Sequence, residues 1–204
     1  MGVKEELLKV GRFPEQLGLD LNSPSDRFKW FLASMLFAKR ISSDIAERTF
    51  KAFVKEGLTT PDKILKANWD KLVEVLDSGG YVRYDFSTAT NILESMKLLK
   101  ERYGGDLEKL HEVAKGPRDL ERKLMEFRGI GPIAVNIFLR ELRGIWSKAD
   151  PKPSHLAFKV AKRIGIKEEE VKEYEPYLVK LAIKFCKKNR CKGCPVKTYC
   201  RKQN

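Results

Sequence analysis

Long apolar segments and strand-like alternation are scarce in this sequence of 204 residues. There is no run of about 18 apolar residues, which excludes a membrane-spanning helix. The first residues, MGVKEELLKVGRF, lack the apolar stretch of a secretory signal, so we expect an intracellular, cytoplasmic protein. Only residues 81–84 resemble a strand, and one short strand cannot build a sheet. With 42% hydrophobic and 34% charged residues, the composition is that of a globular chain rather than a disordered one.

Acidic residues are also in short supply, because 28 Asp and Glu stand against 41 Lys and Arg, for a formal net charge of +13. A positive surplus of this size raises the local concentration of polyanions. Nucleic acid is the first candidate partner and an acidic membrane surface the second. The structural alternative is a thermophile-like surface rich in lysine and glutamate, since glutamates 168–170 lie among lysines.

The hydrophobic periodicity is helical almost throughout, so the sequence predicts an all-α fold. Ser23-Pro24 is typical of a helix start and opens a predicted helix over 24–39. Asn68 is a candidate cap of a helix that ends at Gly79-Gly80. The other predicted helices cover 44–55, a segment opening at Thr60-Pro61, 87–102, 107–114, 118–127, 133–142, 155–163 and 169–187, with an irregular connector at 143–154.

Residues 118–142, RDLERKLMEFRGIGPIAVNIFLREL, predict two helices joined by a tight turn. Gly129 and Gly131 permit positive φ and leave no side chain in the way of an approaching phosphate. Pro132 suits the first turn of the second helix, where an N–H group has no helical partner. Exposed amides at a helix start, together with the positive end of the helix dipole, form an anion site. A plain helical hairpin with a glycine turn is the alternative interpretation.

Cysteine is scarce: there are four, and all lie within the last 19 residues. Cys186, Cys191, Cys194 and Cys200 have the spacing C-x4-C-x2-C-x5-C. In an intracellular chain, clustered cysteines indicate a metal centre more often than disulfides. Zinc and a cubane iron–sulfur cluster both accept four thiolates, so the number of ligands does not choose between them.

Both motifs resemble parts of the endonuclease III-like helix-hairpin-helix (HhH-GPD) superfamily of DNA glycosylases. The family hairpin binds the DNA backbone. The sequence here is similar to it, with a hydrophobic residue followed by Arg-Gly-Ile-Gly-Pro-x-Ala and an apolar helix. The family tail is C-x6-C-x2-C-x5-C around a [4Fe–4S] cluster, commonly with proline after the third cysteine, as at Pro195. The last two gaps match and the first is two residues shorter. The resemblance spans about residues 23–200 and favours iron–sulfur over zinc.

The resemblance implies two helical lobes with a DNA-binding groove between them, into which a target base is flipped. One lobe, 24–132, is a helical barrel that includes the start of the helix-hairpin-helix at 118–142. The other combines 1–23 with 133–204 and carries the cysteine loop, 186–200. The implied DNA-binding residues are Lys39 and Arg40, in the segment that fills the gap left by the flipped base, and Arg128, Gly129, Ile130 and Gly131 in the hairpin.

The catalytic pattern departs from the family in two places. Bifunctional members have a Schiff-base lysine two residues after the second hairpin glycine, and this chain has Ile133 there. The family aspartate aligns with Ser154, and the nearest carboxylate is Asp150, which we predict as the catalytic residue; the alternative is a turn residue beside Pro151.

The sequence therefore predicts a monofunctional base-excision-repair DNA N-glycosylase with a [4Fe–4S] cluster. We expect it to act as a monomer, associated with the nucleoid, on double-stranded DNA containing a damaged or mismatched base. An alkylated purine is the first candidate lesion and an oxidised pyrimidine the next. The main alternative is a catalytically inactive protein of the same fold that binds damaged or distorted DNA, and a zinc-stabilised RNA-binding module is the third interpretation.

Overall fold

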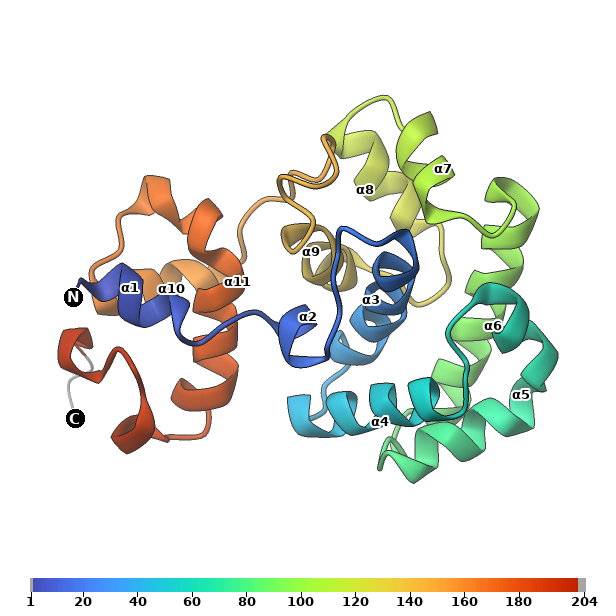
Figure 1. Ribbon diagram of the computed structural model, residues 1–204, viewed down its shortest axis with the longest axis horizontal. Coiled ribbons are helices and arrows are strands. Elements are labelled where there is room, and N and C mark those ends of the chain that lie inside the picture. The colour runs from blue at the N-terminus through green and yellow to red at the C-terminus, as the bar shows by residue number, and fades with distance from the viewer. Residues whose placement is uncertain (1, 202–204) are drawn as a thin grey trace. The chain divides into compact units, whose positions relative to one another are not determined.

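The structure, a computed structural model, describes residues 2–201 and contains only helices, turns and irregular segments within that range (Figure 1). The predicted all-α fold is confirmed. The chain divides into two compact units: unit 2 comprises residues 19–151, and unit 1 combines the residues up to Gly18 with those from Lys152 onward. Each unit has its own buried core and is described separately.

Unit 2 is built of seven helices among its described residues. They are α3 (Pro24–Phe37), α4 (Ser43–Lys55), α5 (Pro61–Ser78), α6 (Asp85–Tyr103), α7 (Leu107–Val113), α8 (Pro117–Met125) and α9 (Pro132–Arg140). α5 is broken at Asn68, whose φ is +63°, and the Asn68 side chain accepts the N–H of Lys71 at 3.1 Å. The predicted helix start at Asn68 is therefore confirmed.

The core of unit 2 forms around α3. Phe31 is fully buried and meets the rings of Phe127 and Phe138 edge-on, with centroids 5.4 Å away in each case. Phe138 in turn meets Trp146 edge-on at 5.5 Å. This aromatic packing places α9 and residues 141–151 in the same compact unit as α3, whereas the sequence analysis assigned residues from 133 onward to the other lobe. The boundary differs because the apolar face of α9 is covered by α3.

The strand-like residues 81–84 form a turn between α5 and α6. Tyr81 is completely buried, and its hydroxyl donates a hydrogen bond to the carbonyl of Leu36 at 2.8 Å. This burial raises the pKa of Tyr81. The apolar pattern at 81–84 therefore reflects one buried aromatic side chain rather than a strand.

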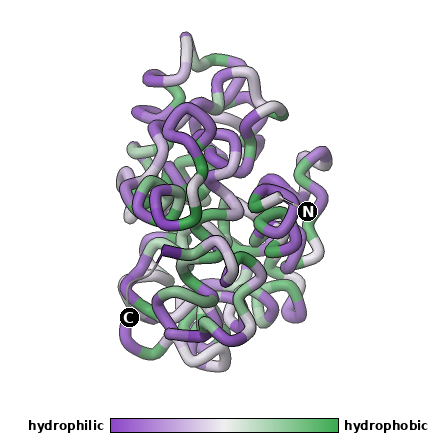
Figure 2. The backbone as a smooth tube through the Cα atoms, turned by 90° about the vertical axis from the view of Figure 1, so that its left-hand side faces the viewer, coloured by the Kyte–Doolittle hydropathy of each residue, from purple (hydrophilic) through white to green (hydrophobic). Residues whose placement is uncertain are grey.

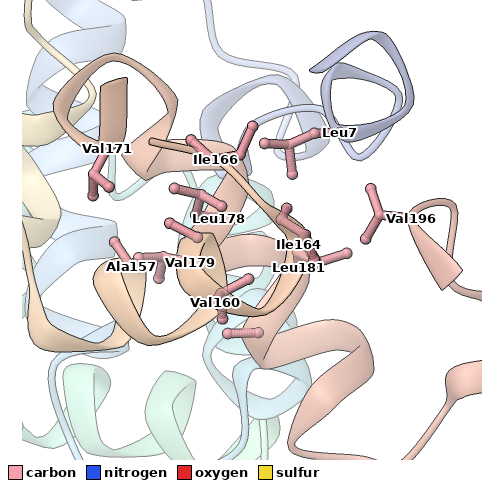
Figure 3. Packing of buried hydrophobic residues seen from close by; sticks show 12 residues of the cluster. Leu7, Ala157, Val160, Ile164, Ile166, Val171, Leu178, Val179, Leu181 and Val196 are labelled. Atoms are coloured by element: carbon pink, nitrogen blue, oxygen red, sulfur yellow. The ribbon is translucent and has the colours of Figure 1, made fainter. Parts of the chain in front are cut away.

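Unit 1 contains α1 (Val3–Leu8), α2 (Phe13–Gln16), α10 (His155–Ile164) and α11 (Val171–Leu181). A short helical turn, η1 (Glu168–Glu170), lies between α10 and α11. Three more follow α11: η2 (Ala182–Cys186), η3 (Cys191–Gly193) and η4 (Lys197–Tyr199). In Figure 3, Leu7 from α1 and Val196 from the cysteine loop lie with Ile164 of α10 and Leu181 of α11 in one apolar cluster. Leu7 and Val196 therefore pack, from opposite ends of the sequence, on the α10–α11 pair. The sequence analysis did not predict α1 and α2, which have only six and four residues.

Hydrophilic and hydrophobic stretches alternate along the chain, as amphipathic helices require (Figure 2). In the described part of the chain, every helix is too short or too polar to cross a membrane.

Candidate nucleic-acid interface

The predicted helix–hairpin–helix is present, with α8 and α9 joined by a turn at 126–131. Gly129 adopts φ +77°, a left-handed conformation that favours glycine. Gly131 is extended, with φ −110° and ψ −175°, and a Cβ atom added to it would meet nothing within 4 Å. The two glycines therefore serve different purposes: the conformation at Gly129 requires glycine, whereas Gly131 keeps the space in front of the turn open.

The main-chain amides of this turn are available to a ligand. Within residues 2–201, no hydrogen bond uses the N–H groups of Gly129, Gly131 or Ile133. Gly129 and Ile133 are exposed and Gly131 is half-buried. These amides lie at the N-terminus of α9, where the helix dipole is positive, so an oxyanion bound there gains both hydrogen bonds and a favourable field.

Ile130 has a different role from its neighbours. Its side chain is buried, and its N–H donates to the carbonyl of Phe127 at 3.0 Å. Neither group is directed to solvent, so Ile130 anchors the turn to the core of unit 2. The predicted contact with DNA at this residue consequently has no exposed donor to make it.

Two side chains of α6 contact the turn, and the sequence analysis missed both. The Ser95 hydroxyl, which is fully buried, donates to the carbonyl of Arg128 at 3.2 Å. The Asn91 amide packs against Gly129 so closely that a Cβ atom on the glycine would lie 2.4 Å from Asn91 Nδ2. A signal exists in the sequence: Asn91 and Ser95 are polar residues four apart, flanked by the buried apolar residues Ile92 and Met96.

The predicted basic residues lie at two different turns of unit 2. Arg128 is exposed at the hairpin, while Lys39 is half-buried and Arg40 exposed in the bend between α3 and α4. Among the described residues, none of the three forms an ion pair with a carboxylate. Glu126, the acid nearest to the hairpin in sequence, is paired with Arg102. The charge at the hairpin turn is therefore net positive.

Asp150 lies exposed at the end of the connector that follows α9. The connector is fastened to α7: the Trp146 indole N–H donates to Glu108 at 3.0 Å, and Lys148 Nζ donates to the carbonyl of His111 at 2.7 Å. Partial burial, and then the charge of Asp150, raise the pKa of Glu121 in α8. Asp150 and Glu121 are thus two carboxyl groups that interact electrostatically within unit 2.

Ser154 occupies the position where the resemblance expects the aspartate. It is the N-cap of α10, and its hydroxyl accepts the N–H of Ala157 at 3.4 Å. The fully buried Glu175 of α11 accepts the Ser154 N–H at 2.7 Å. The start of α10 is therefore fixed by a serine and a buried carboxylate within unit 1, and the serine side chain carries no charge.

The four cysteines lie on a loop that wraps back onto unit 1. Cys186 ends the π-helical turn η2, and the N–H of Cys194 donates to the carbonyl of Cys191 at 3.3 Å. Beyond Cys200, the N–H of Arg201 donates to the carbonyl of Arg163 at 2.8 Å. Together with the buried Val196, this hydrogen bond closes the loop against α10.

The loop fits a four-thiolate centre in the chemistry of its donors. Burial, and then the neighbouring thiols of Cys186, Cys200 and Cys191, raise the pKa of Cys194, so the other three thiols lie within electrostatic reach of Cys194. No disulfide joins them within the described residues. In the same part of the chain, no three His, Cys, Asp or Glu side chains converge closely enough to hold a single metal ion.

Comparison with known proteins identifies the fold. No protein-family model matches the sequence, and no curated protein does so. A solved structure of a non-covalent endonuclease III–DNA complex is similar, with a TM-score of 0.57 and 19% identity over 97% of this chain and 91% of that chain. A trapped endonuclease III–DNA covalent intermediate, an estranged-adenine complex, gives 0.56 and 17% over 98% and 94%. The similarity extends over both units and includes the helix–hairpin–helix, so this chain has the endonuclease III fold.

Proposed function

We propose that the protein binds double-stranded DNA through the hairpin turn at 128–131 and hydrolyses the N-glycosidic bond of a damaged or mismatched base. The observation that carries this proposal is the set of main-chain amides at the start of α9 that form no hydrogen bond within residues 2–201, in a chain with the endonuclease III fold. Main-chain N–H groups contact phosphate without reading a base. Such a site suits an enzyme that must move along DNA in search of a rare lesion.

The charge of the protein supports the same partner. The net charge of +13 attracts the phosphate backbone, and Arg128, which forms no ion pair with a carboxylate within residues 2–201, adds a guanidinium beside the amides. Lys39 and Arg40 supply two further cations at the α3–α4 bend, in the segment that the family resemblance assigns to the gap left by the flipped base. Binding of this kind should weaken steeply as salt is added, because counterions released from DNA drive it.

Ile133 shapes the proposed chemistry. Its side chain is 68% exposed at the start of α9, where a bifunctional relative carries its lysine. An aliphatic side chain cannot attack the sugar, so the proposed reaction uses water as the nucleophile. Asp150 is the proposed residue that stabilises positive charge on the sugar or activates the water. Glu121 of α8 is a second carboxyl group near Asp150, because burial, and then the charge of Asp150, raise the pKa of Glu121.

We propose that Cys186, Cys191, Cys194 and Cys200 hold a [4Fe–4S] cluster. Four thiolates are the ligands that such a cluster needs, and the thiols of Cys186, Cys191 and Cys200 lie within electrostatic reach of Cys194. When bound, the cluster supplies structural cross-linking of the loop rather than reactivity. The loop residues hold it against the core of unit 1 through Val196.

One observation favours a second candidate function. The residue at the N-cap of α10 is Ser154, which lacks the carboxylate of catalytic relatives. If Asp150 does not act in its place, the protein binds damaged or distorted DNA without releasing a base.

An excision assay distinguishes the two functions. Duplexes carrying single alkylated purines, oxidised pyrimidines or mismatches are incubated with the protein and treated with alkali, which cleaves abasic sites. We expect base release by the wild type, none by Asp150→Asn, and full activity in Asp70→Asn, which removes an equally exposed carboxylate from α5. Tight binding of a lesion with no release of any base would support the non-catalytic function instead.

A further inference from the structure

The side-chain amide of Asn91, in α6, lies in close contact with Gly129 of the hairpin turn. A Cβ atom built on Gly129 would lie 2.4 Å from Asn91 Nδ2 and 2.7 Å from its Cγ. The amide of Asn91 thus occupies the place that a side chain at position 129 would take. Because Gly129 is exposed and Asn91 is half-buried, the amide lies at the surface of the turn rather than deep beneath it.

The side chain of Asn91 has no hydrogen-bond partner anywhere in residues 2–201. Its neighbour on the same helix face differs, since Ser95 already donates to the carbonyl of Arg128. The polar atoms of Asn91 are not among the fully buried ones, so they are accessible to a ligand. The amide contacts the turn at Gly129, whose main-chain N–H forms no hydrogen bond within residues 2–201, so it is placed to share a ligand with that group.

We infer that Asn91 is a side-chain donor of the phosphate site, so that Nδ2 and the main-chain N–H groups of Gly129 and Gly131 hold one DNA phosphate together. This inference rests on the proposed DNA binding and adds to it a contact from a helix outside the hairpin. Asn91 is neutral, so its contribution is a hydrogen bond and not the release of a counterion. That difference separates it from the contributions of Arg128 and the lysines.

The test measures affinity for an undamaged duplex by fluorescence anisotropy over a range of salt concentrations. Asn91→Ala should weaken binding about fivefold, the effect of one lost hydrogen bond, with an unchanged slope of log affinity against log salt. Asn91→Asp should weaken it further, because a carboxylate then faces the phosphate. The matched control for Asn91→Asp is Lys97→Gln, which also lowers the net charge by one unit and lies on the exposed surface of the same helix. Thermal unfolding of each variant establishes that it is folded.

The outcomes separate this inference from the proposed function. If both Asn91 variants bind like Lys97→Gln while Gly131→Val loses affinity, Asn91 is not a donor and the hairpin site stands. The slope of log affinity against log salt reports how many phosphates are neutralised by cations. If Asn91→Ala also lowers this slope by an amount that corresponds to about one phosphate contact, the turn has been displaced and the direct contact is refuted. If the wild type does not bind duplex DNA at all, the proposed function itself fails.

Discussion

Replacing Gly129 by alanine perturbs the hairpin turn in two separable ways. The left-handed φ of +77° costs an L-residue about 1–2 kcal/mol. The new methyl group would also meet the Asn91 amide at 2.4 Å, and overpacking of this kind costs about 1–3 kcal/mol. We therefore expect Gly129→Ala to lower the free energy of unfolding by roughly 2–5 kcal/mol in total.

Gly57→Ala shows the first effect alone, so the difference between the two variants isolates the second. Gly57 lies in the same unit at φ +71°, and a Cβ atom on it would meet nothing within 4 Å. Its replacement should cost only the conformational part, about 1–2 kcal/mol. At about 2–4 °C per kcal/mol for a chain of this size, calorimetry should find Gly129→Ala roughly 2–12 °C below Gly57→Ala in melting temperature. In the Asn91→Ala background most of that gap should close, although the Asn91 Cβ still lies 3.0 Å from the added atom. Equal melting temperatures for the two single variants would refute the close approach of Asn91 to the turn.

Three further predictions concern pH, the cysteine loop and salt. Burial, and then the charge of Lys148, lower the pKa of His111, so the unfolded chain binds more protons below about pH 6.5. The stability contributed by neutral His111 is present above that pH and is lost as the pH falls through the lowered pKa. In denaturant titrations at decreasing pH, His111→Gln should therefore lose less free energy of unfolding than the wild type. Identical pH profiles of the two proteins would contradict this. Cys194→Ser should abolish the yellow-brown colour of the purified protein and lower its melting temperature, whereas a coloured variant of unchanged stability would show that the ligands are wrong. Raising the salt concentration fourfold, from about 50 to 200 mM, should weaken duplex binding by more than roughly tenfold; a flat dependence would exclude a phosphate-driven interface.

Local signals in the sequence predict most helix starts correctly. Ser23-Pro24 and Asn68 lie where the structure begins helices, because capping depends on a side chain and the few residues after it. The hairpin is predicted for the same reason, since a glycine at φ +77° and a proline at a first helical turn are local requirements. The fold class follows from helical periodicity along nearly the whole chain.

The contacts between distant segments could not be predicted in this way. Residues 81–84 alternate like a strand, yet their pattern is set by Tyr81 reaching the carbonyl of Leu36, 45 residues away. The division of the chain after Pro151 depends on Phe138 and Trp146 packing in the α3 core. Asn91 contacts a turn 38 positions later in the chain, and only the packing of α6 on the hairpin reveals it.

The affinity of Gly131→Val for duplex DNA tests the account most directly. Gly131 has a negative φ and open space around its Cα, so the valine leaves the fold intact and points its side chain at the incoming phosphate. Anisotropy titrations at one salt concentration should show at least about a tenfold loss of affinity, or about 1.4 kcal/mol, with melting temperature unchanged. A folded Gly131→Val protein that binds duplex as tightly as the wild type would show that DNA does not approach the amides of this turn.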